Sequence, residues 1–454
     1  MISVRRRGVS RLAAAIVASG LIAAGAIATA GPAAADEPVP GHSGAKAVLS
    51  GLKTYDGAVI HDGGDELKVS AGLFEMNVDN GGTIQTYCID IHNPTQNKAQ
   101  YEEKSWAESS LARNDDAGKI RWILQHSYPQ INDLDALAGT AKTGTLTAKT
   151  AAAGTQVAIW RLSDKANVDA VDPQAEKLAD YLVANAQNVA EPAASLTLDN
   201  PAVSGKSGDR LGPITVRTNA ASATVAPAVG NIASGVKVVD RNGRAVTSAA
   251  NGAELFFDVP AGTPDGSSAV TVTASTKVEV GRAFVSQTKS QTQILAGSSV
   301  STVTATATAN WAKKGAIPAL SAEKDCVKGS LAITASNEGD EAFSFELAGV
   351  KHTIEAGKSE TVAIPVKEDQ SYNFTITGPN GFEKTFSGVL DCKTAGPAVP
   401  SSEPSPAGDV SSEDLAETGA NSATTTIAGI AVALVLLGGA TVFFLRRKNN
   451  SAGN

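Results

Sequence analysis

The spacing of apolar residues in the first part of the chain changes from strand-like alternation to a helical period. Residues 67–78 alternate in part between apolar and polar side chains, and residues 80–82 (Asn-Gly-Gly) are a turn signal. Residues 83–91, which follow, are again strand-like. Together these stretches predict a β-hairpin with Cys88 on its second strand.

Three helices are expected after this hairpin. Apolar residues at helical spacing around 120–124 predict the first, which stops before the next proline. The second covers 148–162, and the third begins with Asp172 as its N-cap and Pro173 as its first residue. We therefore expect a folded unit of mixed α and β structure over residues 43–193.

The remainder of the chain is strand-like and then low in apolar residues. Residues 195–318 are rich in Val, Thr, Ser, Ala and Gly, and their short strands predict an Ig-like β-sandwich. Residues 319–393 repeat the pattern on a smaller scale, and residues 394–414 have the Pro, Ser and acidic composition of an extended linker. The expected fold is multidomain, a mixed α/β domain followed by two all-β Ig-like domains.

The two ends of the chain have the features of an exported protein. Arginines at 5–7 precede an apolar stretch and a run of alanines, so residues 1–35 are predicted to be a signal peptide. A retained membrane anchor is the alternative. Residues 427–445 form an apolar run long enough to cross a bilayer, and the basic tail Arg446–Lys448 follows it.

A short motif precedes this apolar run. Its residues are Leu415, Ala416, Glu417, Thr418 and Gly419. Motif, apolar run and basic tail together (415–454) resemble a cell-wall sorting signal, here an LAxTG variant of the commoner LPxTG. The resemblance implies that a sortase cuts between Thr418 and Gly419 and joins the protein to peptidoglycan. Contact with the membrane is then expected only through the sorting helix before cleavage.

Charge excludes one class of partner. Loss of both ends removes seven basic residues and no acidic ones, so the formal net charge falls from −8 to −15. A surface this acidic repels nucleic acid and anionic lipid. We therefore expect a protein that is secreted, attached to the cell wall and exposed at the cell surface, with no nucleic-acid partner.

The three cysteines divide into a pair and a single residue. Cys326 and Cys392 are at the two ends of a segment of the length of a small β-domain, and a disulfide between them would close nearly all of it into one loop. Cys88 is then left without a partner. A buried core cysteine is the ordinary interpretation of such a residue.

Two short stretches change that interpretation. Thr86–Asp90 (TYCID) and Thr155–Trp160 (TQVAIW) resemble the paired motifs of the thioester-domain (TQxA) surface adhesins of Gram-positive bacteria. The resemblance implies that Cys88 and Gln156 condense, with loss of ammonia, to an internal thioester. The residues around the bond are expected to support it, namely Tyr87, Asp90, Thr155 and Trp160. Gln156 also falls within an apolar stripe of its predicted helix, where an unpartnered amide is costly.

The resulting hypothesis is a cell-wall adhesin that captures an amine on a target protein or polymer. Attack by a lysine amine on the Gln156 carbonyl would leave an amide bond and a free Cys88 thiol. This reaction happens once per molecule, so the protein would not be an enzyme. The sequence shows no phosphate-binding loop, HExxH motif or clustered Cys/His spacing, so no cofactor or metal is expected.

Three alternatives remain open at this point. A cysteine hydrolase would need His92 or His126 as its base, and neither is in a motif typical of catalytic dyads. A structural wall protein, or a minor or tip pilin, would keep Cys88 buried and unreacted. Independently of these, Lys237 and Asn310 are candidates for a Lys–Asn cross-link in the second domain.

Overall fold

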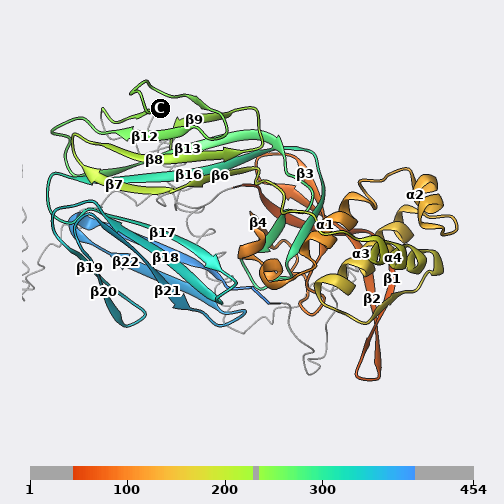
Figure 1. The fold of residues 1–454 in the computed structure, drawn as a ribbon. Helices are drawn as coiled ribbons and strands as arrows, with labels where there is room; N and C mark the ends of the chain where they lie inside the picture. Colours follow the sequence, from red (N-terminus) through yellow and green to blue (C-terminus); the bar gives the residue numbers. More distant parts are fainter. Residues whose placement is uncertain (1–43, 229–234, 394–454) are drawn as a thin grey trace, which may run out of the picture. The chain divides into compact units, whose positions relative to one another are not determined.

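The computed structural model describes residues 44–228 and 235–393. The predicted signal peptide (1–35), linker (394–414) and sorting signal (415–454) lie outside these ranges. Over the two described ranges, none of the helices is long and apolar enough to cross a membrane. The described residues form several β-sheets and one group of helices, all within one unit of the chain (Figure 1).

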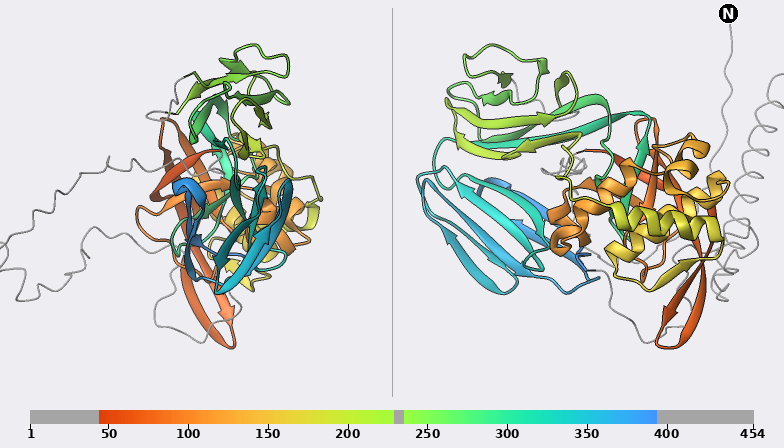
Figure 2. Two further views of the ribbon diagram at one scale, coloured as in Figure 1. Left: turned by 90° about the vertical axis from the view of Figure 1, so that its left-hand side faces the viewer. Right: turned by 45° about the vertical axis from the view of Figure 1, so that its right-hand side comes forward.

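A seven-stranded sheet organises the N-terminal part of the molecule. In spatial order its strands are β2 (Asp65–Val78), β3 (Thr83–Cys88), β15 (Gln293–Ser298), β14 (Ala283–Ser286), β4 (Gln100–Lys104), β1 (Lys46–Asp62) and β5 (Val168–Ala170). The predicted hairpin is confirmed, since β2 and β3 pair antiparallel with Phe74 opposite Thr86. The longer β1–β2 hairpin extends well beyond the rest of the sheet (Figure 2).

A group of helices covers this sheet. They are α1 (Ala117–Gln125), α2 (Leu134–Ala141), α3 (Ala148–Ser163) and α4 (Pro173–Asn185), with the short 3₁₀ turns η1 (Trp106–Glu108) and η2 (Ser110–Arg113) before them. The group covers the sheet through α3, with α4 touching the edge strand β5 and α1 and α2 packing on other helices. The three predicted helices are confirmed as α1, α3 and α4, and the Asp172 carboxylate caps α4 as expected. The short helix α2 and the strands β1, β4 and β5 were not predicted from the sequence.

The chain between 196 and 312 builds two further sheets. The first contains β10 (Lys237–Val239), β12 (Glu254–Asp258), β8 (Arg210–Thr218) and β6 (Leu196–Asp199). The second contains β11 (Ser248–Ala249), β9 (Ala223–Pro227), β13 (Gly266–Lys277), β16 (Val300–Ala312) and β7 (Ala202–Lys206). Buried side chains from both sheets, among them Val216 and Val272, belong to one core.

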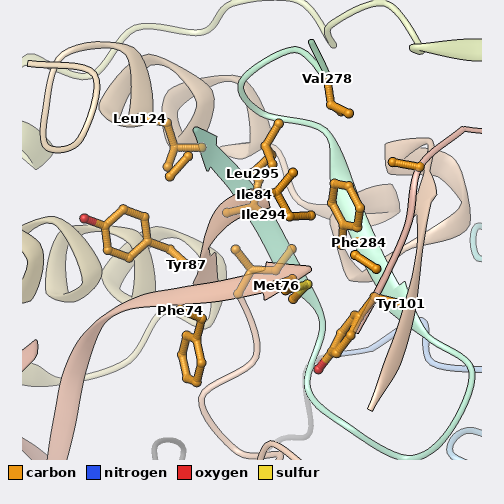
Figure 3. Close-up of a cluster of buried hydrophobic side chains, with 14 of the residues drawn as sticks. Phe74, Met76, Ile84, Tyr87, Tyr101, Leu124, Val278, Phe284, Ile294 and Leu295 are labelled. Carbon is orange, nitrogen blue, oxygen red and sulfur yellow. The ribbon is translucent and has the colours of Figure 1, made fainter. Parts of the chain in front are cut away.

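One part of the expected organisation needs correction. We assigned all of 195–318 to the sandwich, yet β14 and β15 leave it and enter the N-terminal sheet between β3 and β4. Nearly every residue of these two strands is buried, because a central strand covered on both faces needs no alternation. Figure 3 shows Ile294 and Leu295 beside Ile84 and Met76 in the shared core.

A buried ion pair holds this insertion in place. Arg282, which directly precedes β14, lies 3.0 Å from the carboxylate of Glu103 on β4, and both side chains are almost fully buried. The same carboxylate accepts hydrogen bonds from the backbone N–H groups of Ala45 and Ser195. The buried charge of Glu103 is thus compensated on all sides, as burial of a carboxylate requires.

The C-terminal β-domain comprises three small sheets with their own core. The strands are β17 (Pro318–Asp325), β18 (Ser330–Asn337) and β21 (Lys358–Pro365) in one sheet, β19 (Phe343–Leu347) with β20 (Val350–Ile354), and β22 (Ser371–Thr377) with β23 (Glu383–Val389). The 3₁₀ turn η3 (Pro379–Gly381) precedes β23. The disulfide between Cys326 and Cys392 is present, which confirms that prediction.

Candidate functional site

Cys88 and Gln156 lie at the contact between the sheet and α3. Cys88 is the last residue of β3, and Gln156 is in the middle of α3, which packs on β1, β2 and β3. Neither side chain is exposed to solvent. On the other side of α3, Gly154 allows α4 to come close, because a Cβ there would lie 2.4 Å from the carbonyl oxygen of Ala175. The helix is therefore held tightly from both sides.

The amide of Gln156 is clamped by the backbone of Cys88. The Cys88 N–H donates to Gln156 Oε1 at 2.9 Å, and Gln156 Nε2 donates to the Cys88 carbonyl oxygen at 2.8 Å. This reciprocal pair satisfies the buried amide, whose burial without partners would be costly. It also brings the glutamine carbonyl next to the residue that carries the thiol.

The sulfur itself is buried in an acidic environment. Its first contact is the backbone N–H of Asp90, which donates to Cys88 Sγ at 3.3 Å. Burial raises the pKa of the thiol well above its usual value, and the carboxylates of Asp164 and Asp90 raise it further. The indole of Trp160 opposes part of this rise. These surroundings therefore oppose ionisation of the unreacted Cys88 thiol.

Asp90 is placed differently from the prediction. We expected residues 83–91 to be strand-like, but β3 ends at Cys88 and Asp90 lies in the loop that follows. It approaches the sulfur through its backbone N–H instead. Its carboxylate is fully buried, accepts a short hydrogen bond from the side chain of Asn93, and keeps Oδ1 without a hydrogen-bond partner in the described chain.

A second carboxylate, Asp164, completes the acidic surroundings. It follows α3 and accepts from the Ile91 N–H at 3.1 Å and from the Ser163 hydroxyl at 2.6 Å. Burial raises the pKa of Asp90 and of Asp164 to about 7. Each can therefore hold or release a proton near neutral pH. Sequence reasoning missed Asp164 because its position at the end of a helix is also typical of an ordinary C-cap.

Tyr87, Thr155 and Trp160 form the walls of the site. The Tyr87 hydroxyl donates to the carbonyl oxygen of Tyr128 at 2.8 Å, and burial raises its pKa far above the usual range. Thr155 donates to the Ala151 carbonyl at 2.8 Å, a local backbone bond of the kind expected for it. The Trp160 indole is buried, and its nitrogen has no hydrogen-bond partner among the described residues. Of the four predicted supporting residues, Asp90 and Trp160 act on the Cys88 sulfur, whereas the side chains of Tyr87 and Thr155 bond to the backbone elsewhere.

Neither His92 nor His126 is hydrogen-bonded to Cys88 in the described part of the chain. His126 stacks on Trp122 with ring centroids 4.0 Å apart, and its Nδ1 lies 2.8 Å from the Trp122 carbonyl oxygen. Burial lowers the pKa of His92, and neither histidine hydrogen-bonds to Cys88 within the described ranges. Within the described ranges, the sulfur therefore has a raised pKa and no hydrogen bond to either of the two histidines considered as its base.

The candidate cross-link of the second domain is not assembled. Lys237 is exposed on β10, in the four-stranded sheet. Asn310 is on β16, in the five-stranded sheet, and its side chain donates to the carbonyl oxygen of Pro318. The two residues are therefore placed on different sheets, and the asparagine already has another partner.

Comparison with known proteins supports the thioester motifs. Residues 85–188 match the family model of the thioester domain, which confirms the resemblance for the segment that holds Cys88 and Gln156. Residues 318–389 match the model of the bacterial phospholipase C, C-terminal domain. No curated protein sequence matches the chain.

Two solved structures are similar to the chain at low identity. The Bacillus anthracis TIE protein is 16% identical, with 77% of this chain and 81% of that chain covered and a TM-score of 0.27. The thioester domain of the Enterococcus faecium TIE86 protein is also 16% identical, with 61% of this chain and 99% of that chain covered and a TM-score of 0.27. TM-scores this low do not establish a shared arrangement of domains.

Proposed function

We propose that this protein carries an internal thioester between Cys88 and Gln156 and uses it to capture an amine on a target surface. The observation that supports this most directly is the reciprocal hydrogen bonding between the Gln156 amide and the backbone of Cys88. The match of residues 85–188 to the thioester domain supports the same assignment.

Bond formation would follow from this geometry. The sulfur of Cys88 adds to the Gln156 carbonyl carbon, while the Cys88 N–H already donates to the oxygen on which negative charge develops. The C–N bond of the amide then breaks, and ammonia leaves with the proton released by the thiol. A carboxyl group with a pKa of about 7, such as that of Asp90, is suited to hold this proton in passing.

In capture of the target, the Cys88 sulfur would be the leaving group instead of the attacking group. An incoming primary amine attacks the same carbonyl carbon, the C–S bond breaks, and the thiol regains a proton as the amide bond forms. The raised pKa of Cys88 favours this outcome, because the released sulfur is held as a thiol, which is a poor nucleophile for the back reaction. Each molecule reacts once, so the protein is a covalent binder and not an enzyme.

Burial of the site limits what can react with it. Cys88 and Gln156 are both fully buried, so water is kept from the acyl group, and an amine must enter through a local opening. A small amine such as methylamine needs less opening than a protein lysine. We expect methylamine to react faster than a bulky primary amine of similar basicity, as measured by adduct formation over time.

The remaining features complete the proposal. We infer that the protein is secreted, that a sortase joins Thr418 to peptidoglycan, and that the folded domains are displayed at the cell surface as an adhesin. Its partners would be the sortase, peptidoglycan and an amine-bearing protein or polymer. A structural wall protein or minor pilin with an unreacted Cys88 is the alternative, and it predicts a different mass.

Intact mass of the purified protein tests the proposal. The wild type should be lighter by one ammonia than the disulfide-bonded chain, and the methylamine adduct should be heavier than that chain by one CH₂, because a methylamide replaces the Gln156 amide. Cys88→Ala and Gln156→Ala should have full mass and form no adduct, whereas Gln287→Ala, at an exposed glutamine, should behave as wild type. A full-mass wild type with a titratable Cys88 thiol would refute the thioester and favour the structural alternative.

A further inference from the structure

A second polar cluster lies at the end of the C-terminal β-domain, apart from the residues that hold the Gln156 amide. It consists of Glu368, Asp369 and Asp391, and one carboxylate oxygen from each of them lies within 4.8 Å of the other two. We call these three residues the acidic cluster. Since calcium binds oxygen ligands at 2.3–2.6 Å, two ligands on opposite sides of one ion are about 4.8 Å apart. The three carboxylates are therefore close enough to share an ion.

Asp391 gives this cluster an unsatisfied buried oxygen. Its side chain is only 4% exposed. Its Oδ2 accepts a hydrogen bond from the Thr292 hydroxyl at 2.9 Å, but its Oδ1 has no hydrogen-bond partner in the part of the chain that the structure describes. A carboxylate oxygen buried without a partner is costly. Either a proton or a cation is needed there.

The other two carboxylates are only partly engaged by the protein. Glu368 Oε1 accepts from the backbone N–H groups of Cys392 and Lys393, at 2.6 and 2.8 Å, which fixes the glutamate beside Asp391. Asp369 Oδ2 lies 3.4 Å from the ammonium of Lys289, whose side chain is more than half exposed. No ion pair reaches Asp391 within the described ranges. Two lysines oppose these three acidic groups, namely Lys289, which pairs with Asp369, and Lys324, whose charge acts on Asp391 without a direct ion pair.

A fourth carboxylate adds to the negative charge. Asp90, in the loop after Cys88, is close enough to Asp369 and Asp391 to interact with both electrostatically, and it too keeps one buried oxygen without a partner. Two buried carboxylates with unpartnered oxygens are therefore next to each other. A doubly charged ion held directly by the carboxylates compensates this arrangement better than Lys289 and Lys324, neither of which bonds to the unpartnered oxygen of Asp391 within the described ranges.

We propose that Glu368, Asp369 and Asp391 bind a calcium ion. All donors are carboxylate oxygens, which suit hard cations, and calcium tolerates the irregular geometry and added water ligands that three side chains leave open. With so few protein ligands the dissociation constant is expected on the order of 10⁻⁴ to 10⁻³ M. Lys289 competes with the ion for Asp369.

The position of this site links two parts of the fold. Asp391 precedes Cys392 of the disulfide, and its partner Thr292 precedes Gln293, which pairs with Cys88 across β15 and β3. An ion at the acidic cluster would stabilise the contact between the end of the C-terminal β-domain and the strand beside the thiol. This inference does not depend on whether the thioester forms.

Isothermal titration of the metal-free full chain with calcium chloride tests the proposal. We expect one site per chain and a rise in the midpoint of thermal unfolding with calcium. Asp391→Asn and Glu368→Gln should weaken binding at least tenfold, and Glu368→Gln keeps the oxygen that accepts from Cys392 and Lys393. Lys289→Gln should strengthen binding, which a purely structural role of the cluster would not produce. Asp65→Asn, at an exposed carboxylate on the β1–β2 hairpin, should match the wild type.

Several outcomes would overturn the site. Absence of heat and of a thermal shift at 10 mM calcium, roughly ten times the weakest expected dissociation constant, would do so. Unchanged affinity in Asp391→Asn and Glu368→Gln would also do so, provided that thiol titration shows the disulfide intact. If Asp391→Asn does not fold, Glu368→Gln and Lys289→Gln decide the question, and failure of their affinities to move in opposite directions would reject the assignment. Equal affinity for magnesium would reject calcium as the ion.

Discussion

Cys88 and Cys392 are both buried cysteines, yet their surroundings favour different chemistry. Cys392 meets a second sulfur, and its bond to Cys326 closes the C-terminal β-domain. Cys88 meets no other sulfur and lies instead against the amide of Gln156, which its own backbone holds in place. Burial is common to both residues, so burial does not explain the difference. The neighbouring functional group does.

The two regions also manage acidic groups in different ways. Around Cys88, the carboxylates of Asp90 and Asp164 accept hydrogen bonds from Asn93, Ile91 and Ser163. Next to Cys392, Asp391 likewise accepts a hydrogen bond, from Thr292, and like Asp90 it keeps one oxygen without a partner among the described residues, but two further carboxylates, Glu368 and Asp369, lie beside it. The first set of carboxylates is suited to handle protons, whereas the second has the composition of a cation site. Substitution of one neighbouring residue at a time tests which contacts produce this difference.

The largest effect is expected from Gln156→Glu. Glutamate is close in size and shape, but its carboxylate is a very poor acyl donor and would face the Cys88 carbonyl oxygen without the donor that Nε2 supplies. We expect complete loss of the mass deficit and of the methylamine adduct, together with destabilisation of about 3 kcal/mol from the buried charge. Intact mass and denaturant unfolding measure the two effects. Retention of a mass deficit in this variant would show that another residue is the acyl donor.

The second prediction concerns the disulfide. Replacing Cys326 and Cys392 together by serine removes a bond that spans a sequence separation of 66 residues. In the chain-entropy model this costs about 4 kcal/mol of unfolding free energy. The loss should be confined to the C-terminal β-domain, because Cys88 and Gln156 are held by other elements. Thermal unfolding should show an earlier transition while the methylamine adduct still forms.

The variant without the disulfide also tests whether Cys88 reacts independently of the C-terminal β-domain. If loss of the disulfide abolished adduct formation in a protein that remains folded, the reactivity of Cys88 would depend on the C-terminal β-domain. The contact between Thr292 and Asp391 would then be the first place to look for the coupling.

Local patterns were sufficient to predict the elements that carry the thioester residues. The turn at residues 80–82 and the cap at Asp172 act within a few residues, so the β2–β3 hairpin and α4 could be located from the sequence. The meeting of Cys88 and Gln156 could not be derived in this way. It depends on the packing of α3 on the sheet, and the motif resemblance supplied it.

Features made by distant parts of the chain were missed. β14 and β15 join the N-terminal sheet from about 200 residues away along the chain, and nothing in a continuous apolar run indicates which sheet it will enter. The acidic surroundings of Cys88 were missed for the same reason. Asp164 and Asp391 approach this region from a helix end and from the C-terminal segment, and neither occurs in a local motif.

The third prediction is a pH dependence of stability. The pKa of Asp90, of Asp164 and of Asp391 is raised to about 7 from an ordinary value of 3.8. Between these values the folded state binds more protons than the unfolded state, so the unfolding free energy should fall as pH rises from about 4 to about 7. Asp90→Asn should reduce this slope by roughly one third, because it removes one of three such groups.

Denaturant unfolding at several pH values, with a chelator present, checks this slope. Adding calcium should flatten the part of the slope that belongs to Asp391, since an ion replaces the proton there. Asp65→Asn is the matched control and should leave the slope unchanged. A stability that rises from pH 4 to pH 7 would contradict the prediction for all three carboxyl groups.

The smallest effect is expected from Tyr87→Phe, which tests how far the walls of the thioester site matter. The change removes the hydroxyl that donates to the Tyr128 carbonyl at 2.8 Å but keeps the buried ring, so destabilisation should be about 1 kcal/mol. The Cys88–Gln156 clamp is made by other atoms, and the mass deficit should persist. Methylamine should react somewhat faster if the Tyr87 hydroxyl helps to keep the site closed. An unchanged rate would instead assign the closure to the strands beside Cys88, and a lost mass deficit would make Tyr87 part of the bond-forming chemistry itself.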